Sequence, residues 1–351
     1  MFGLLCLLPA ILSLFPPTVR ESGNTYVSPA KRIVTISAGL SEYVAVSETA
    51  DPIIGCSEYG YDVAMAGLMG EMYPKLKDRR IRMKVFPIDP EQYIQYDLDA
   101  IVLDTNQVDV FKQIGYSRLA VTHYNGNDRT GNEIETLQLM GKLTGKNERA
   151  NRLIKKYSLN EFAAIKELIP ETVTPIRISV LVSSGSDGIW MPTGRNYYML
   201  YIPEFLGAVN AARPGLFSRG MFNPEQIIEA DPDIIFINSV PGDGFFPATI
   251  YNKPEWQALR AVRQKKVYRI PVWSYLGGPA ENALLLRWFA EIFYPERTPC
   301  LLRQKYREFY QEVYHYTLSD AEIDQSVFVE ENRLSAGYER FRQENTGNTL
   351  N

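Results

Sequence analysis

The chain has 351 residues and a mass of 40.0 kDa, with 45% hydrophobic, 12% aromatic and 22% charged residues. This composition is typical of a folded globular protein and excludes a disordered chain, a collagen-like fibre and a polytopic membrane protein. Lys and Arg number 37 and Asp and Glu number 41, so the net charge is −4. A nucleic acid is not an expected partner, because no basic surplus could neutralise its phosphates.

An apolar segment opens the chain. The run in residues 1–17, MFGLLCLLPAILSLFPP, is too short to span a membrane and has the length of a signal-peptide core. We expect residues 1–22 to be a leader that directs export to the periplasm or another extracytoplasmic compartment, with the mature chain peripheral to the membrane. A buried N-terminal segment is the alternative, and whether the leader is cleaved or anchors the protein stays open. Outside the leader only Cys56 and Cys300 remain, and two separate buried thiols are favoured over a pair.

From Lys31 onward, short apolar strands alternate with helices. Strands are predicted at 31–36, 52–56, 100–104 and 118–122, and helices at 40–50, 91–96 and 108–114. Residues 59–82 are rich in Gly, Met and Tyr, and their weak periodicity indicates a loop with a short helix. This strand–helix–strand order is typical of a parallel sheet, so residues 31–128 should form an N-terminal α/β lobe.

Helical periodicity dominates the next segment. Apolar residues recur at helical spacing between 131 and 168, and Gly141 and Gly145 indicate a break between one helix and a longer one that begins near Glu148. No flexible tether rich in Gly, Ser or Pro occurs here. Residues 129–173 should therefore be a stiff helical connection that includes a bridging helix.

A second α/β series follows the helical connection. Strands are predicted at 177–182, 234–238 and 267–270, and helices at 197–205, 225–229, 280–293 and 301–314. Residues 174–316 should form a C-terminal α/β lobe. Residues 317–351 are polar, and we expect a frayed tail.

An internal repeat links the two series. DPEQYIQYDLDAIV at 89–102 aligns without gaps to NPEQIIEADPDIIF at 223–236. Asp89 and Asn223 can each accept a free N–H of the first helical turn, and the proline at the first position loses no hydrogen bond. Glu91 and Glu225 then meet the positive end of each helix, so a purely structural role in the helix start is one interpretation of both.

The order of several motifs between Arg32 and Tyr314 resembles the substrate-binding proteins of ABC importers for iron chelates, haem and cobalamin. The motifs are Arg32-Ile33-Val34, Ile54-Gly55, the two PEQ helices, LMGKLTGK at 139–146, PEWQALRAVR at 254–263 before Lys266-Val267-Tyr268, and Arg287-Trp288-Phe289-Ala290 before Tyr294-Pro295. The resemblance implies an α/β fold of two Rossmann-like lobes joined by a single long rigid helix, with the ligand cleft between the lobes.

The resemblance also implies a function. The chain would be a monomeric receptor that delivers an iron(III) chelate, a siderophore or haem-like compound, to an ABC permease dimer and its ATPase. A receptor of the same fold for cobalamin or for molybdate or tungstate, and a ligand-sensing scaffold without transport, are the alternatives. The stretch from Val63 to Arg82 is longer than its counterpart in cobalamin receptors, which favours the metal-chelate branch.

Site residues follow from the matching positions. In the family a glutamate on each lobe docks onto permease arginines, and the matching residues are Glu91 and Glu225. Ligand contacts are expected after the carboxyl ends of strands, at Tyr59, Tyr61, Asn106, Trp190, Arg195, Arg219, Trp273 and Tyr275. Aromatic faces suit a planar macrocycle, and arginines suit an anionic chelate. Tyr59 or Tyr61 could offer a phenolate to ferric iron or haem, and a packing role stays open for every one of these residues.

Enzyme motifs are missing from the sequence. It contains no P-loop and no GxGxxG motif, and Gly185-Ser186-Asp187-Gly188 lacks the spacing of a nucleophile elbow. His123 and His315 are the only histidines, too few for a typical zinc hydrolase or a receptor that binds a bare divalent metal, and we expect a surface role and a structural role for them. The sequence therefore predicts a protein that binds its ligand without chemistry and has no cofactor of its own.

Overall fold

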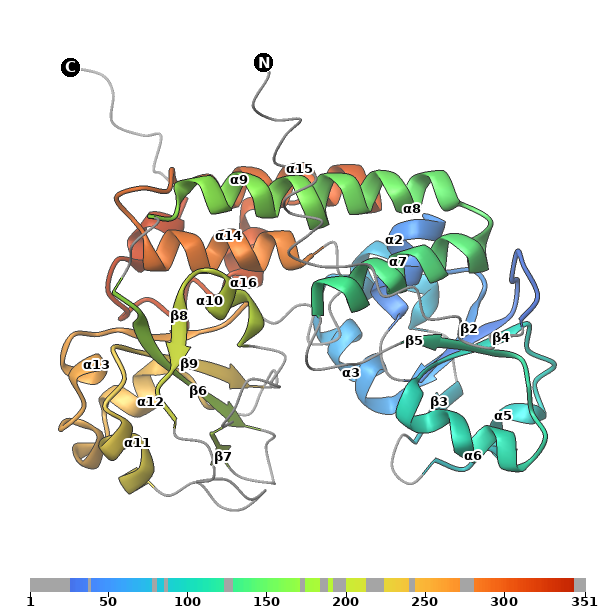
Figure 1. The fold of residues 1–351 in the computed structure, drawn as a ribbon, viewed down its shortest axis with the longest axis horizontal. Coiled ribbons are helices and arrows are strands. Elements are labelled where there is room, and N and C mark those ends of the chain that lie inside the picture. Colours follow the sequence, from blue (N-terminus) through green and yellow to red (C-terminus); the bar gives the residue numbers. More distant parts are fainter. Residues whose placement is uncertain are drawn as a thin grey trace. The chain divides into compact units, whose positions relative to one another are not determined.

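The computed structural model describes eleven stretches of the chain (Figure 1), namely 26–36, 39–77, 81–84, 88–122, 129–170, 174–183, 189–191, 200–212, 224–239, 244–271 and 281–343. The chain divides into two compact units. Unit 1 comprises Met1–Glu167, Trp273–Ala283 and Glu312–Tyr316, and unit 2 comprises Leu168–Val272, Leu284–Gln311 and Thr317–Asn351. No helix within the described stretches combines the length and apolarity that a bilayer crossing requires.

Unit 1 contains a parallel sheet in the strand order β3-β2-β1-β4-β5. Its strands are β1 (Ile33–Thr35), β2 (Ile53–Ser57), β3 (Ile81–Met83), β4 (Ala100–Asp104) and β5 (Leu119–Thr122). The four predicted strands are confirmed. Strand β3 was not predicted, because it is three residues long and follows a segment of weak periodicity.

Helices cover both faces of this sheet. They are α2 (Leu40–Ser47), α3 (Glu58–Ala66), α4 (Met69–Met72), α5 (Glu91–Ile94), α6 (Val108–Gln113) and α7 (Arg129–Thr144), with 3-10 turns η1 (Pro74–Leu76) and η2 (Thr105–Gln107). Tyr93 of α5 and Phe111 of α6 pack with Val34, Ile101 and Leu103 on one face. Successive side chains of a strand point to opposite faces, so the residues between these in β1 and β4 face the helices on the other side of the sheet.

Gly39 brings α2 close to the opposite face. Its φ of 116° lies in a region that other residues rarely adopt, and an added Cβ would lie 2.8 Å from Cγ1 of Val102 and 3.6 Å from Cε of Met140. Glycine therefore allows α2 to begin directly against β4 and α7.

The helical connection is continuous from 147 to 168. It consists of α8 (Asn147–Leu153), a π-helical turn η3 (Ile154–Asn160) and α9 (Glu161–Leu168). The predicted start near Glu148 is confirmed, whereas Gly141 lies inside α7 rather than at a break. An added Cβ on Gly141 would lie 2.8 Å from Cβ of Ala150, so this glycine lets α7 and α8 approach each other. The break occurs at Gly145, whose φ is 73°.

Unit 2 is built on a sheet in the order β10-β9-β6-β7, with β8 paired to β6. Its strands are β6 (Ile176–Ser183), β7 (Ile189–Trp190), β8 (Ala208–Asn210), β9 (Ile234–Ser239) and β10 (Val267–Arg269). All pairs are parallel except β6 with β7. The short strands β7 and β8 share the edge of β6, one at each end, and neither was predicted.

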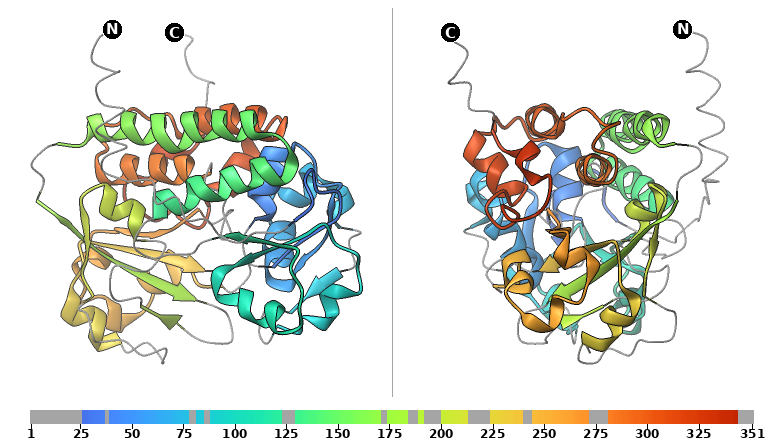
Figure 2. Two further views of the ribbon diagram at one scale, coloured as in Figure 1. Left: turned by 45° about the vertical axis from the view of Figure 1, so that its right-hand side comes forward. Right: turned by 90° about the vertical axis from the view of Figure 1, so that its left-hand side faces the viewer.

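Two layers enclose the unit 2 sheet (Figure 2). Its helices are α10 (Tyr201–Phe205), α11 (Pro224–Ala230), α12 (Pro247–Tyr251), α13 (Arg260–Arg263), α14 (Asn282–Phe293) and α15 (Leu302–Tyr314), with the 3-10 turn η5 (Pro254–Trp256). Helices α11, α12 and α13 pack with Ile235 and Ile237 on one face. Phe236 and Tyr268 point to the other face, where they contact Trp288 of α14.

The C-terminal segment corrects the prediction of a frayed tail for the described residues 317–343. It forms α16 (Asp320–Ser326) and η6 (Tyr338–Phe341), and Tyr338 and Phe341 are almost fully buried. Asn332 is buried beside the edge strand β10, where its side chain accepts from the Arg269 N–H (2.6 Å) and donates to the Arg269 carbonyl (2.9 Å). The polar side chain of Asn332 thus completes the hydrogen bonding of a sheet edge.

Candidate functional site

The carboxyl edge of the unit 1 sheet is the first candidate site. Strands β1 and β4 are neighbours, yet the chain leaves β1 toward β2 and leaves β4 toward β5. Open α/β sheets bind ligands at such a reversal of strand order, outside the carboxyl ends of the strands. The segments that follow β1 and β4 therefore have the position of a ligand site.

The turn after β4 is held rigidly. The Asp104 N–H donates to Oε1 of Gln107 (3.0 Å), and the Asp104 side chain accepts from the Gln107 N–H to complete a capping box. The Thr105 hydroxyl donates to the carbonyl of Thr122 on β5 (3.2 Å). Gln107 is buried by these contacts, while the predicted ligand residue Asn106 is exposed at the tip of the turn. The geometry leaves an amide side chain accessible on a fixed backbone.

A buried glutamate lies on α2, directly after β1, and the sequence analysis did not single it out. Glu42 is only 2% exposed, and the Ser41 hydroxyl donates to its Oε2 (3.1 Å). Burial raises the pKa of Glu42 to about 7, and the nearby carboxylate of Glu281 contributes in the same direction. Glu281 is also buried and accepts a hydrogen bond from the Tyr314 hydroxyl (2.7 Å). No local pattern marks Glu42, because the neighbouring carboxylate of Glu281 comes from a distant part of the chain.

The two tyrosines after β2 lie on α3. Tyr61 is 7% exposed, and its hydroxyl donates to the carbonyl of Lys77 (2.9 Å). This placement argues against Tyr61 as a ligand or metal contact, because its oxygen is held inside the unit. Tyr59 follows the carboxyl end of β2 by two residues, and its side chain lies outside the described part.

The carboxyl edge of the unit 2 sheet is described only in part. Trp190 pairs with Val182 near the carboxyl end of β6, which places its backbone at the expected edge. The Ser239 hydroxyl at the end of β9 donates to the Phe245 carbonyl (3.0 Å). The remaining predicted ligand residues, Arg195, Arg219, Trp273 and Tyr275, lie outside the described residues, as does His123.

His315 has the structural role that was predicted. Its Nε2 lies 2.8 Å from Glu48 at the end of α2, and Lys146 and Arg149 contact the same carboxylate at 2.7 Å and 3.0 Å. The hydrogen bond from Lys146 is the largest of the effects that lower the pKa of Glu48 to about 2. This cluster ties α2 and α8 to the end of α15 within unit 1.

The repeated segments have the same environment in each unit. In unit 1, Asp99 accepts from the backbone N–H groups of Lys31 (2.7 Å) and Arg32 (3.0 Å). In unit 2, Asp233 accepts from the backbone N–H of Arg177 (2.9 Å). The helix before each aspartate carries an exposed glutamate in its first turn, Glu91 in α5 or Glu225 in α11. The sequence repeat is therefore also a structural repeat.

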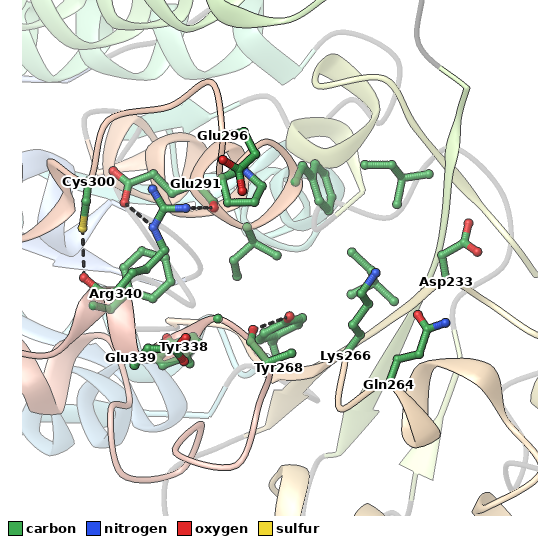
Figure 3. A pocket seen from close by; sticks show the side chains of 18 of the residues that line it. Asp233, Gln264, Lys266, Tyr268, Glu291, Glu296, Cys300, Tyr338, Glu339 and Arg340 are labelled. Atoms are coloured by element: carbon green, nitrogen blue, oxygen red, sulfur yellow. Dashed lines mark hydrogen bonds and ion pairs between the residues drawn. The ribbon is translucent and has the colours of Figure 1, made fainter.

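A cavity of about 820 Å³ lies at the amino ends of β6, β9 and β10, away from the carboxyl edge (Figure 3). Arg340 donates from its side chain to the carbonyls of Glu291 and Thr298, both at 2.9 Å, and the Cys300 thiol donates to the Arg340 carbonyl (2.9 Å). Burial raises the pKa of Glu291, whose Oε1 accepts from the Leu301 N–H (3.0 Å). These charged groups hold the C-terminal segment against α14.

The cysteines are separate thiols. Cys56 is buried in β2, as expected, whereas Cys300 is exposed. Among the described residues, no cluster of three or more His, Cys, Asp or Glu side chains is arranged to hold a metal ion.

Comparisons with known proteins agree with this architecture. A family model described as periplasmic binding protein matches residues 84–272. No curated protein sequence is significantly similar to the chain.

Several solved structures share the fold. A periplasmic solute binding protein from Veillonella parvula is 21% identical, with a TM-score of 0.72 over 88% of this chain and 94% of that one. Helicobacter pylori CeuE with Ni(II) bound is 20% identical, with a TM-score of 0.68 over 87% and 96%. Haemophilus influenzae MolA bound to molybdate is 15% identical, with a TM-score of 0.68 over 84% and 96%.

Proposed function

The chain belongs to the periplasmic binding protein family, and from this premise we propose that it captures an iron(III) chelate outside the cytoplasm and delivers it to an ABC permease. Its class is that of a solute-binding protein and not of an enzyme. The ligand is a siderophore complex or a haem-like compound, and it binds at the carboxyl ends of the strands.

The turn at Asn106 is the main observation in favour of a ligand site at the carboxyl edge of the unit 1 sheet. Its backbone is fixed by the Asp104 and Gln107 capping box, and Asn106 is exposed where the strand order reverses. A prearranged polar group of this kind orients a small ligand at little entropic cost. Two histidines in 351 residues do not favour capture of a bare metal ion, whereas the aromatic and arginine candidates suit a chelate.

Related folds support a metal-containing ligand. CeuE holds Ni(II), MolA holds molybdate, and another protein of similar fold is a periplasmic haem-binding protein from Roseiflexus. An iron chelate combines a metal with the aromatic or anionic groups that the candidate residues would recognise. Tyr59 is the remaining candidate for a direct phenolate contact, because the Tyr61 hydroxyl is already bonded to Lys77.

A binding screen tests this function. Purified protein is mixed with ferric hydroxamate and catecholate siderophores, haemin, cyanocobalamin, molybdate or tungstate, and unfolding is followed by calorimetry. A ferric complex at 100 times its Kd should stabilise the protein by about 2.7 kcal/mol, because it binds only the native state. The variant Asn106→Ala should bind more weakly, whereas Asp109→Ala on the exposed side of α6 should bind normally. Stabilisation by molybdate or cobalamin alone would replace the iron proposal, and no stabilisation by any compound would favour a scaffold without transport.

A further inference from the structure

The two repeated helices expose an isoleucine as well as a glutamate. Ile94 on α5 is 47% exposed and Ile228 on α11 is 39% exposed. Within the described part of the chain, six large apolar side chains are exposed to a comparable degree, namely Val27, Ile94, Ile114, Val209, Ile228 and Leu334. Two of these six occupy the same position of the gap-free repeat, three residues after Glu91 and Glu225.

Helix geometry joins each isoleucine to its glutamate. Residues three apart lie on neighbouring positions of a helix surface, so Glu91 with Ile94 and Glu225 with Ile228 each form one continuous patch. The residue just before each isoleucine, Tyr93 or Ile227, is fully buried and fixes the helix on its own sheet. The isoleucines are therefore presented outward by a helix that is anchored from beneath.

Both patches lie on segments without basic residues, and the start of α5 is fixed by Asp89. Asp89 accepts from the Glu91 N–H and from the Gln92 amide, both at 3.1 Å, which holds the start of α5 in place. Neither 89–96 nor 224–231 contains a lysine or an arginine. Glu91 and Glu225 are exposed, so each patch presents a carboxylate beside an apolar side chain, and its complement is a basic surface with an apolar depression.

We infer that Ile94 and Ile228 are permease contacts, each packing into an apolar depression beside the basic side chains that receive Glu91 or Glu225. This inference rests on the proposed function, since it assigns a second component to the docking surface. The chain has two such patches, one in each repeat. A permease dimer with two-fold symmetry has two equivalent depressions, one for each patch. The glutamates govern the rate and salt dependence of encounter, and the isoleucines slow dissociation through buried apolar area.

The test measures binding of the full chain to the importer's permease and ATPase in lipid nanodiscs. The double variant Ile94→Ser with Ile228→Ser should bind on the order of 100-fold more weakly, about tenfold for each buried isoleucine, mainly through faster dissociation. The loss should persist at high salt. The variant Glu91→Ala with Glu225→Ala should instead associate more slowly, with a weaker salt dependence than the wild type. Ligand affinity and thermal stability should match the wild type in the isoleucine variant, because both side chains are exposed.

A matched control replaces two other exposed apolar residues, Ile114→Ser on the end of α6 and Val209→Ser on β8, and should bind the importer normally. Wild-type affinity in the isoleucine variant, together with loss in the glutamate variant, would overturn this inference and leave the proposed function standing. A wild-type protein that forms a dimer lost in the isoleucine variant would also overturn it. No binding of the wild type to the importer would overturn the proposed function and the inference together.

Discussion

Folding shifts the pKa values of two glutamates in unit 1 in opposite directions. Glu42 is enclosed in unit 1 beside Ser41 and near Glu281, and burial raises its pKa to about 7. Most stabilising carboxylates act in the opposite sense, as Glu48 does, where the Lys146 hydrogen bond is the largest of the effects that lower the pKa to about 2. Glu42 is therefore a carboxyl that folding keeps protonated below about pH 7.

The change Glu42→Gln tests whether the raised pKa of Glu42 makes stability depend on pH. Above about pH 4.5 the unfolded wild type releases the proton of Glu42, whereas the folded state keeps it. The contribution of Glu42 to the free energy of unfolding is therefore complete below that pH and is lost as the pH rises through about 7. The loss is on the order of 3 kcal/mol, from a shift of roughly 2.5 pH units at 1.36 kcal/mol each. The free energy of unfolding of the glutamine variant should not show this loss. The measurement is the difference in unfolding free energy between the two proteins from pH 4 to 8, which should change across this range. A constant difference across this range would contradict the assignment.

At the scale of elements, the repeat is one helix-to-strand unit used twice. Asp99 before β4 and Asp233 before β9 each accept backbone N–H groups at the start of the neighbouring strand. Their own N–H groups donate to the Arg32 (2.8 Å) and Arg177 (2.7 Å) carbonyls. Asp97 and Asp231 each pair with an arginine, Arg118 at 3.1 Å and Arg260 at 3.5 Å. These contacts set where each central pair of strands begins.

Replacing either aspartate should loosen one unit only. Asp99→Ala and Asp233→Ala should each destabilise by about 1.5–3 kcal/mol, the range for hydrogen bonds to charged groups. Hydrogen exchange should increase in β1 and β4 for the first variant and in β6 and β9 for the second. Asp109→Ala, at an exposed position of α6, serves as the control and should leave exchange unchanged. Equal acceleration in both units by one variant would disprove a local role.

At the scale of the whole molecule, each unit is assembled from separate stretches of the chain. The boundaries at 167/168, 283/284 and 311/312 fall inside α9, α14 and α15. The last stretch completes unit 2, where Trp288 donates to the Tyr338 hydroxyl (3.0 Å) and Asn332 bonds both backbone groups of Arg269. Unit 2 therefore depends on residues near the end of the chain.

A chain that ends at Tyr316 should fail to form unit 2, because it exposes the aromatic layer around Trp288 and leaves the edge of β10 unpaired. Loss of near-ultraviolet circular dichroism and of the thermal transition of unit 2 would show this. A milder variant, Asn332→Ala, should cost about 2–4 kcal/mol, since two backbone groups of β10 lose their partner. Leu334→Ser, at an exposed position of the same segment, should be neutral. Wild-type stability of the truncated chain would contradict this role.

The sequence alone determined the parallel α/β series, the continuous helix from 147 to 168, the repeat at 89–102 and 223–236 and the family resemblance, which the comparisons confirm. These features arise from residues close together in the chain, through apolar periodicity and helix caps. Only the tertiary structure decided that Tyr61 is bonded internally, that Glu42 is buried near Glu281 and that Asn332 completes β10. Those contacts join residues far apart in sequence, and a polar residue that pairs with a sheet edge has the same local pattern as one in water.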